Sequence, residues 1–251
     1  MLIDYYPEAV KNPATHELID DIHESSERLI AIVNDFLDAS RLEQNRFVYN
    51  LQEVALAEVA EKVIYEMSST AKAKNIKLEL GEGFHYDGLP HLVADPGRIK
   101  QILYNLIGNA VKFTDQGGVT LDAKLDGDRV AITVTDTGRG ISLESQALLF
   151  HKFQQATDSI LTRDNTKGTG LGLYISRLLA EGMGGSLNLK QSTTGQGSTF
   201  IVQLPVATPG RLKALAAAKA KVTDSNTGLT TGTRPTAGAQ AEPANTTITA
   251  R

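Results

Sequence analysis

Residues 95–114, DPGRIKQILYNLIGNAVKFT, are the stretch that decides the fold of this chain. Asp95 is a favourable N-cap and Pro96 a favourable first helical residue, so the start of a helix is encoded here. An α-helix turns by about 100° per residue, and at that period one face of this helix is apolar and is predicted to lie in the core. The members of this apolar face are Ile99, Ile102, Leu103, Leu106, Ala110 and Phe113.

A polar stripe runs beside the apolar face of the same helix. It consists of Arg98, Asn105, Asn109 and Lys112. Because Asn costs a helix interior roughly 0.6 kcal/mol relative to Ala, two Asn residues in the middle of this helix need an explanation. Two explanations are open at this point: a solvated polar edge, or a site where amide oxygens bind a hard cation and the ammonium binds phosphate.

The composition is that of a globular protein. The 251 residues are 41% hydrophobic and 22% charged, enough for one substantial core and a smaller element. No apolar run approaches the roughly 20 residues of a membrane span and no signal peptide opens the chain. We therefore expect a cytoplasmic location, with any membrane anchor of a longer parent protein lying upstream.

Two further totals exclude classes of function. The absence of cysteine rules out disulfides, thiolate catalysis and Cys-based zinc sites. The formal net charge of −4 offers no electrostatic reason to bind nucleic acid, so we expect no nucleic-acid partner.

Residues 18–42 carry a seven-residue repeat, with steps of three and four between its positions. The positions are Ile19, Ile22, Ser26, Leu29, Val33, Phe36 and Ser40, widened by Ile30 and Leu37. Such a stripe is typical of a coiled coil or helix bundle. Since one helix cannot bury it, we expect the partner helix in another chain or upstream.

Alternating apolar and polar residues predict short strands along the rest of the chain. The predicted strands are 47–51, 76–80, 91–94, 119–125, 129–136, 186–190 and 198–204, with further helices at 54–67 and 173–183. Asp126-Gly127-Asp128 predicts a hairpin turn. The pattern indicates an α+β fold: a two-layer α/β sandwich with a mixed, mostly antiparallel sheet and helices on one face, preceded by a bundle-type helix.

Asp136 is a candidate binding residue, because period-two alternation places it on the same strand face as its apolar neighbours Val130, Ile132 and Val134. A carboxylate that faces the core is costly unless it is paired, and the exocyclic amine of adenine is a suitable donor at the mouth of such a pocket. Gly138 and Gly140 would let the backbone pass close to a flat ligand. The alternative is that Asp-Thr-Gly only ends a strand in a turn.

A Gly-rich turn, GTGLGL at 168–173, opens the helix at 173–183 and follows a long segment with little periodicity. Backbone N–H groups at such a helix start can bind phosphate. The spacing excludes both GxxxxGK[ST] and GxGxxG. Upstream of the long segment, Phe150 and Phe153 can pack together on one side of a turn. Thr199, at the start of the last strand, has a hydroxyl that could reach a base.

These stretches, in this order, resemble the ATP-binding module of sensor histidine kinases, within the larger group that includes DNA gyrase, the MutL proteins and the ninety-kilodalton heat-shock chaperones. NLIGNAVKFT (105–114) resembles the N box and DTGRG (136–140) the first glycine box. FHKF (150–153) resembles the F box and GTGLGL (168–173) the second glycine box. The resemblance implies that ATP and Mg²⁺ bind here.

The resemblance also implies a role for each matched residue. Asn109 would bind Mg²⁺, Asn105 would support the metal and the phosphates, and Lys112 would contact phosphate. Asp136 would recognise adenine, with Thr199 beside it. The remaining nucleotide-binding positions are Gly138 and Gly140 at the base, Phe153 in the F box, and Gly168, Gly170, Leu171, Gly172 and Leu173 at the lid and phosphate end. His151 stands where the F box more often has an acidic residue.

SSERLIAIVNDFLDASRLE (25–43) resembles the second helix of the dimerisation and histidine-phosphotransfer hairpin. The expected domains are a partial hairpin at 1–45, an ATP-binding catalytic domain at 46–207 and a disordered, low-complexity tail at 208–251. The family's acceptor motif, similar to HELRTP, is absent. His16 is followed by Glu-Leu but lacks the rest, and His23 lies on the same helix, so we expect the acceptor histidine outside this chain.

The function implied is a histidine kinase catalytic core of a two-component system, which would work as a homodimer and serve a response regulator. One alternative is a dimerising module that binds ATP without phosphotransfer of its own. Another is an ATPase of the gyrase or MutL kind, although those proteins use a Glu as general base where this chain has Asn105.

Overall fold

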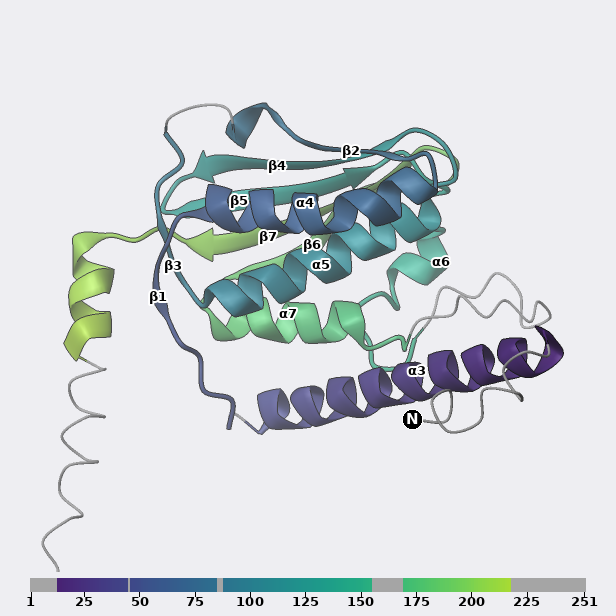
Figure 1. Ribbon diagram of the computed structural model, residues 1–251. Helices are drawn as coiled ribbons and strands as arrows, with labels where there is room; N and C mark the ends of the chain where they lie inside the picture. The colour runs from purple at the N-terminus through teal and green to yellow at the C-terminus, as the bar shows by residue number, and fades with distance from the viewer. Residues whose placement is uncertain (1–12, 45, 85–87, 155–168, 218–251) are drawn as a thin grey trace, which may run out of the picture. The chain divides into compact units, whose positions relative to one another are not determined.

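The computed structural model describes residues 13–44, 46–84, 88–154 and 169–217 (Figure 1). The chain divides into two compact units, and the fold described below is that of the first, Met1–Leu212. Gly168 and most of the predicted tail lie outside the described residues. Among the described helices, none is both long enough and apolar enough to cross a membrane.

The elements follow one another in the order α3 (Pro13–Glu43), β1 (Gln52–Val54), α4 (Leu56–Ala73), β2 (Lys77–Leu80), η1 (Glu82–Phe84), β3 (Leu92–Ala94), α5 (Pro96–Phe113), β4 (Gly118–Asp126), β5 (Arg129–Asp136), α6 (Leu143–Gln146), α7 (Gly172–Gly182), β6 (Ser186–Thr193) and β7 (Gly197–Pro205).

The main sheet has five strands in the order β2-β4-β5-β7-β6. The pair β2 and β4 is parallel and the other pairs are antiparallel. Helices α4, α5 and α7 cover one face of this sheet (Figure 1). The predicted two-layer α+β sandwich with a mixed, mostly antiparallel sheet is confirmed.

The hairpin of β4 and β5 turns at the predicted place. Asp126 pairs with Arg129, and Gly127 adopts φ +63° in the two-residue loop between them. Glycine adopts a positive φ at the first position of a two-residue loop without steric cost, which suits Gly127 to this turn.

Two local predictions were wrong. Residues 47–51 form no strand, since β1 begins only at Gln52 and pairs with β3 in a separate two-stranded sheet. The side chains of residues 47–51 alternate between half-buried and exposed, as those of a strand would. Their backbone, however, pairs with no strand of the described structure. Helix α4 begins at Leu56 and continues to Ala73, beyond the predicted end at Met67, because Ala71 also packs into the core.

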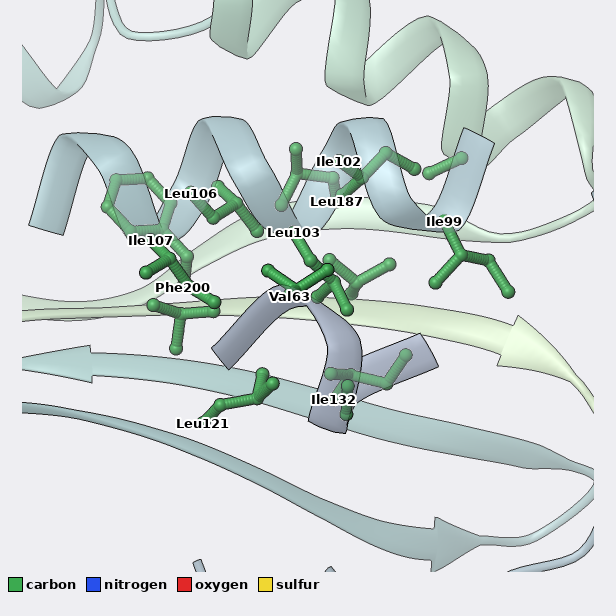
Figure 2. Close-up of a cluster of buried hydrophobic side chains, with 14 of the residues drawn as sticks. Val63, Ile99, Ile102, Leu103, Leu106, Ile107, Leu121, Ile132, Leu187 and Phe200 are labelled. Carbon is green, nitrogen blue, oxygen red and sulfur yellow. The ribbon is translucent and has the colours of Figure 1, made fainter. Parts of the chain in front are cut away.

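Helix α5 begins as predicted. The Asp95 side chain accepts hydrogen bonds from Gly97 N and Arg98 N, and Pro96 is the first helical residue. Its apolar face forms the centre of the core with residues of α4 and the sheet (Figure 2). The buried face is wider than predicted, because Ile107 and Val111 are also buried against neighbouring elements.

The prediction that Phe113 belongs to the core was wrong. Helix α5 ends at Phe113, whose side chain is 38% exposed, while the following Thr114 is fully buried. The Thr114 hydroxyl donates to Ala110 O. The buried residue at this end of the helix is therefore Thr114, one position after the Phe113 that the helical period predicts.

Helix α3 has two unlike parts. Near its C-terminus Ala39 and Leu42 are buried in the core cluster, and this end of the helix packs against α7. The earlier part leaves its large apolar side chains exposed, namely Leu18, Ile22, Leu29, Ile30, Val33, Phe36 and Leu37. The predicted bundle face is therefore uncovered within the described part of this chain.

Leu103→Ala should lower the free energy of unfolding by about 3 kcal/mol, because it removes buried methyl groups and leaves a cavity. Leu125→Ala, at a β4 side chain that is 55% exposed, is the matched control and should change it by less than about 0.5 kcal/mol. Urea denaturation of the two variants measures the difference. Equal effects would contradict the central place of α5 in the core.

Candidate functional site

The two asparagines of α5 are joined to each other and to α7. Asn105 Nδ2 donates to Ser176 Oγ over 3.0 Å, and Asn109 Nδ2 donates to Asn105 Oδ1 over 3.3 Å. Both side chains are half-buried. Gly172, the first residue of α7, lies so close that a Cβ there would be 2.3 Å from Asn105 Oδ1. The asparagine pair is thus set against the start of α7.

This pair leaves an oxygen ligand available. Among the described residues, Asn109 Oδ1 has no hydrogen-bond partner, whereas Asn105 Oδ1 is engaged by Asn109 Nδ2. An amide oxygen is a ligand that a hard cation accepts. The Asn109 amide oxygen is therefore available to a cation.

The other two members of the polar stripe contact aromatic rings. The Arg98 guanidinium stacks 4.4 Å above the Phe47 ring and donates to Gln101 Oε1, so Arg98 holds the segment before β1. Lys112 Nζ lies 5.3 Å from the centre of the Phe113 ring, and the Arg139 guanidinium lies 4.6 Å from the same ring. Two cations therefore gather at the C-terminal end of α5.

Asp136, at the end of β5, faces the core side of the sheet as its alternation predicts and is 8% exposed. Its Oδ1 accepts hydrogen bonds from Gly138 N and Ser198 N. Burial raises the pKa of the Asp136 carboxyl above its ordinary value of 3.8, and the two backbone hydrogen bonds oppose that rise. Asp136 Oδ2 has no hydrogen-bond partner among the described residues. Because every fully buried side-chain oxygen in that part of the chain has a partner, Oδ2 is not fully buried and is open to a donor from outside.

The residue beside Asp136 is Ser198 rather than Thr199. Ser198 pairs directly with Asp136 across the strands and shares the core side of β7 with Phe200 and Val202. Thr199 points to the opposite face, where its hydroxyl lies 3.2 Å from that of Thr135. Counting back by two from the apolar residues of β7 would have selected Ser198 from the sequence.

Gly138 and Gly140 are close to backbone of this chain. A Cβ at Gly138 would lie 2.4 Å from Phe113 O, and one at Gly140, whose φ is +69°, would lie 2.1 Å from Thr193 O. Arg139 N also donates to Phe113 O. Gly138 therefore allows the exit of β5 to pack on the C-terminal end of α5, the helix that carries the asparagines, while Gly140 allows it to pack on the end of β6.

The described part of the second glycine box forms the start of α7. Thr169 Oγ1 accepts a hydrogen bond from Leu171 N, and Gly170 adopts φ +70°. Leu171 is fully buried in the core, and Leu173 packs against it. Of the predicted positions in this box, Gly172 is the one that meets the asparagine pair.

Phe153 does not join these groups in the described structure. Its side chain is 58% exposed and its φ is +59°, whereas Phe150 is half-buried against the core. The Arg177 guanidinium lies 5.6 Å from the Phe150 ring.

A separate hollow of about 330 Å³ lies where α3, the segment before β1 and α7 meet. It is lined by Leu42, Phe47, Tyr49, Leu178, Glu181 and Gly182. None of these residues belongs to the predicted site.

Asp136→Asn should leave the free energy of unfolding near neutral pH unchanged or higher, by up to about 1 kcal/mol. A carboxyl whose pKa is raised by folding contributes stability that is complete below its unfolded pKa and is lost as the pH rises through the folded pKa. The amide removes that loss. Denaturation of both proteins at pH 7 and at about pH 4 measures the difference between their free energies of unfolding, which should be smaller at the lower pH. A variant that is less stable than the unchanged chain at both pH values would contradict this prediction.

The chain is similar to known proteins. Residues 94–208 match the family described as histidine kinase-, DNA gyrase B-, and HSP90-like ATPase. The circadian input-output histidine kinase CikA of Synechococcus elongatus is 41% identical over 193 residues, which cover 76% of this chain and 25% of CikA. The sensor histidine kinase GacS of Pseudomonas protegens is 36% identical over 76% of this chain and 21% of its own length.

Solved structures agree. Full-length ShkA, crystallised in complex with AMPPNP, aligns with 78% of this chain and 40% of its own at a TM-score of 0.67 and 35% identity. The histidine kinase AdeS of Acinetobacter baumannii shares the fold at a TM-score of 0.62 and 20% identity, over 78% of this chain and 86% of its own.

The chain spans between about a fifth and a quarter of the length of these two curated relatives. The four motifs and the sandwich that positions them agree with the family match, which confirms the resemblance. Residues 94–208 therefore form a domain of the histidine kinase-, DNA gyrase B-, and HSP90-like ATPase family, of the type found in sensor histidine kinases.

Proposed function

We propose that this chain is the catalytic core of an ATP-dependent protein-histidine kinase, which transfers the γ-phosphoryl group of Mg-ATP to a histidine outside the chain. The observation that carries the proposal is one juxtaposition. An amide pair suited to a metal-bound phosphate lies on the second half of α5, and the buried carboxylate of Asp136, suited to a base, ends the strand whose exit packs on the C-terminal end of that helix.

At the base end, Asp136 Oδ2 would accept a hydrogen bond from the exocyclic amine of adenine. Its Oδ1 is already occupied by two backbone N–H groups, which hold the carboxylate in place. Because Ser198 rather than Thr199 lies beside Asp136, we assign the neighbouring polar contact to the Ser198 hydroxyl.

At the phosphate end, Asn109 Oδ1 would bind Mg²⁺, and Asn105 would orient Asn109. Lys112 would contact phosphate oxygens. The backbone N–H groups of Gly170 and Gly172 would add donors at the start of α7. Bound Mg²⁺ supplies charge neutralisation on the phosphates, and the side chains mainly position the γ-phosphoryl group.

The partners follow from α3. Its exposed apolar face would pair with the same helix of a second copy in a homodimeric bundle. The acceptor histidine would come from a helix of that bundle outside this chain, and the phosphoryl group would pass on to a response regulator. His16 hydrogen-bonds to Asp20 on the exposed surface of α3 and lacks the family's acceptor motif.

A second candidate is a dimerising module that binds ATP without phosphotransfer of its own. The absent acceptor motif is the observation in its favour. An ATPase of the gyrase or MutL kind is less well supported, because the position of the general base holds the amide of Asn105, which donates to Ser176.

Asn109→Ala and Asp136→Ala should each lower the affinity for Mg-ATP at least about 100-fold, since each removes a charged or metal-binding contact. Asn188→Ala, an exposed position in β6, is the control and should bind normally. Titration calorimetry with Mg-ATP measures all three. Retained affinity in both site variants would defeat the assignment of the site.

Phosphotransfer is tested by labelling with γ-labelled ATP and Mg²⁺ in the presence of an added acceptor hairpin from a related kinase. We expect an acid-labile, base-stable label on the hairpin and none on this chain. No label on either, with ATP binding intact, would favour the binding-only module. A label on this chain that disappears in His16→Ala would show that the chain is its own acceptor.

A further inference from the structure

Helix α3 makes direct polar contacts with the start of α7. Asp35 Oδ2 accepts a hydrogen bond from Thr169 Oγ1 over 3.1 Å. Two turns further along, Glu43 Oε1 accepts from Tyr174 Oη over 2.8 Å and forms an ion pair with Lys152. Both acidic residues lie on the part of α3 that packs against α7.

The Asp35 contact is made in a partly dehydrated place. Burial raises the pKa of the Asp35 carboxyl, and the hydrogen bond from Thr169 opposes that rise, while the nearby charge of Asp38 adds to it. A carboxylate that loses water needs a donor in exchange. Thr169 is that donor among the described residues, so the contact is specific rather than a chance approach of two surface side chains.

Thr169 passes this contact on to the first turn of α7. The same hydroxyl that donates to Asp35 accepts a hydrogen bond from Leu171 N over 3.1 Å. The next residue, Gly172, is the one that leaves no room for a Cβ beside Asn105. A continuous series of contacts therefore leads from Asp35 to Asn105, and from Asn105 to Asn109 Nδ2.

We propose that Asp35 is a positioning residue for the phosphate end of the nucleotide site: through Thr169 it holds the first turn of α7 against Asn105. The inference rests on the proposed function, because it assigns Asn109 and the start of α7 to the phosphates of ATP. Since coupling between two sites is reciprocal, bound ATP would also strengthen the attachment of α3 to α7.

The test compares ATP with adenosine, which lacks the phosphates. Asp35→Ala and Thr169→Val should each weaken binding of Mg-ATP about five-fold, the usual effect of losing one hydrogen bond, and leave the affinity for adenosine unchanged. Thr169→Val also removes the acceptor of Leu171 N, so the double variant should bind Mg-ATP no more weakly than Thr169→Val alone, because the Asp35 contact is already lost in that variant. Glu27→Ala, on the exposed part of α3, should bind both ligands normally.

Conservative variants separate the hydrogen bond from the charge. Asp35→Asn keeps an oxygen that can accept from Thr169, and Thr169→Ser keeps the hydroxyl, so both should bind Mg-ATP within about two-fold of the unchanged chain. If the Asp35 carboxylate instead acted by repelling phosphate, Asp35→Ala and Asp35→Asn would both bind ATP more tightly than the unchanged chain, and the proposal would be overturned.

Three other results would also overturn it: ATP affinity unaltered in Asp35→Ala, adenosine affinity lowered as much as ATP affinity, or additive losses in the double variant. Failure of the proposed function is seen separately. An unchanged chain that binds neither Mg-ATP nor adenosine would reject that function and this inference with it, whatever the variants do.

Discussion

The burial of α5 between the sheet and its neighbouring helices is the interaction on which the rest of the structure depends. Its apolar side chains fill the centre of the core. Both of its ends are also tied to other elements. Asp95 accepts from Asn50 N as well as from the first turn, and Lys74 Nζ donates to the carbonyls of Val111, Lys112 and Thr114. A helix held along its face and at its ends cannot turn, so its polar edge has one orientation.

The candidate site contains a buried carboxylate, which costs stability. Asp136 is a carboxylate in a place that raises its pKa, and the two backbone N–H groups compensate only one of its oxygens. The close packing of Gly138 on the carbonyl of Phe113 fixes the carboxylate relative to α5. A ligand that donates to the second oxygen would recover part of that cost, which is a physical reason for retaining a buried charge at a binding site.

Helix α3 carries both a contact with the Gly-rich turn and an uncovered apolar face. One part of it is packed on α7 and bonded to the Gly-rich turn, while the other part presents an uncovered apolar face. Because α3 is one continuous helix, a displacement of its apolar face can be transmitted to its contact with α7. The contact of Asp35 is part-buried, that of Glu43 is exposed and Leu42 lies in the core.

The sequence by itself determined the elements whose residues follow a local period. The cap and the 3.6-residue pattern of α5, the alternation that turns Asp136 inward and the order of the four motifs depend on neighbouring residues. They were enough to predict the sandwich and the side of the sheet that Asp136 faces. Only the tertiary structure decided what depends on residues far apart in the chain. Phe113 is exposed and lies beneath two cations, and Arg98 stacks on Phe47. Residues 47–51 have no strand partner, and Asp35 accepts a hydrogen bond from Thr169. A local period gives the direction of a side chain, but the group it meets there comes from another part of the chain, and only folding brings the two together.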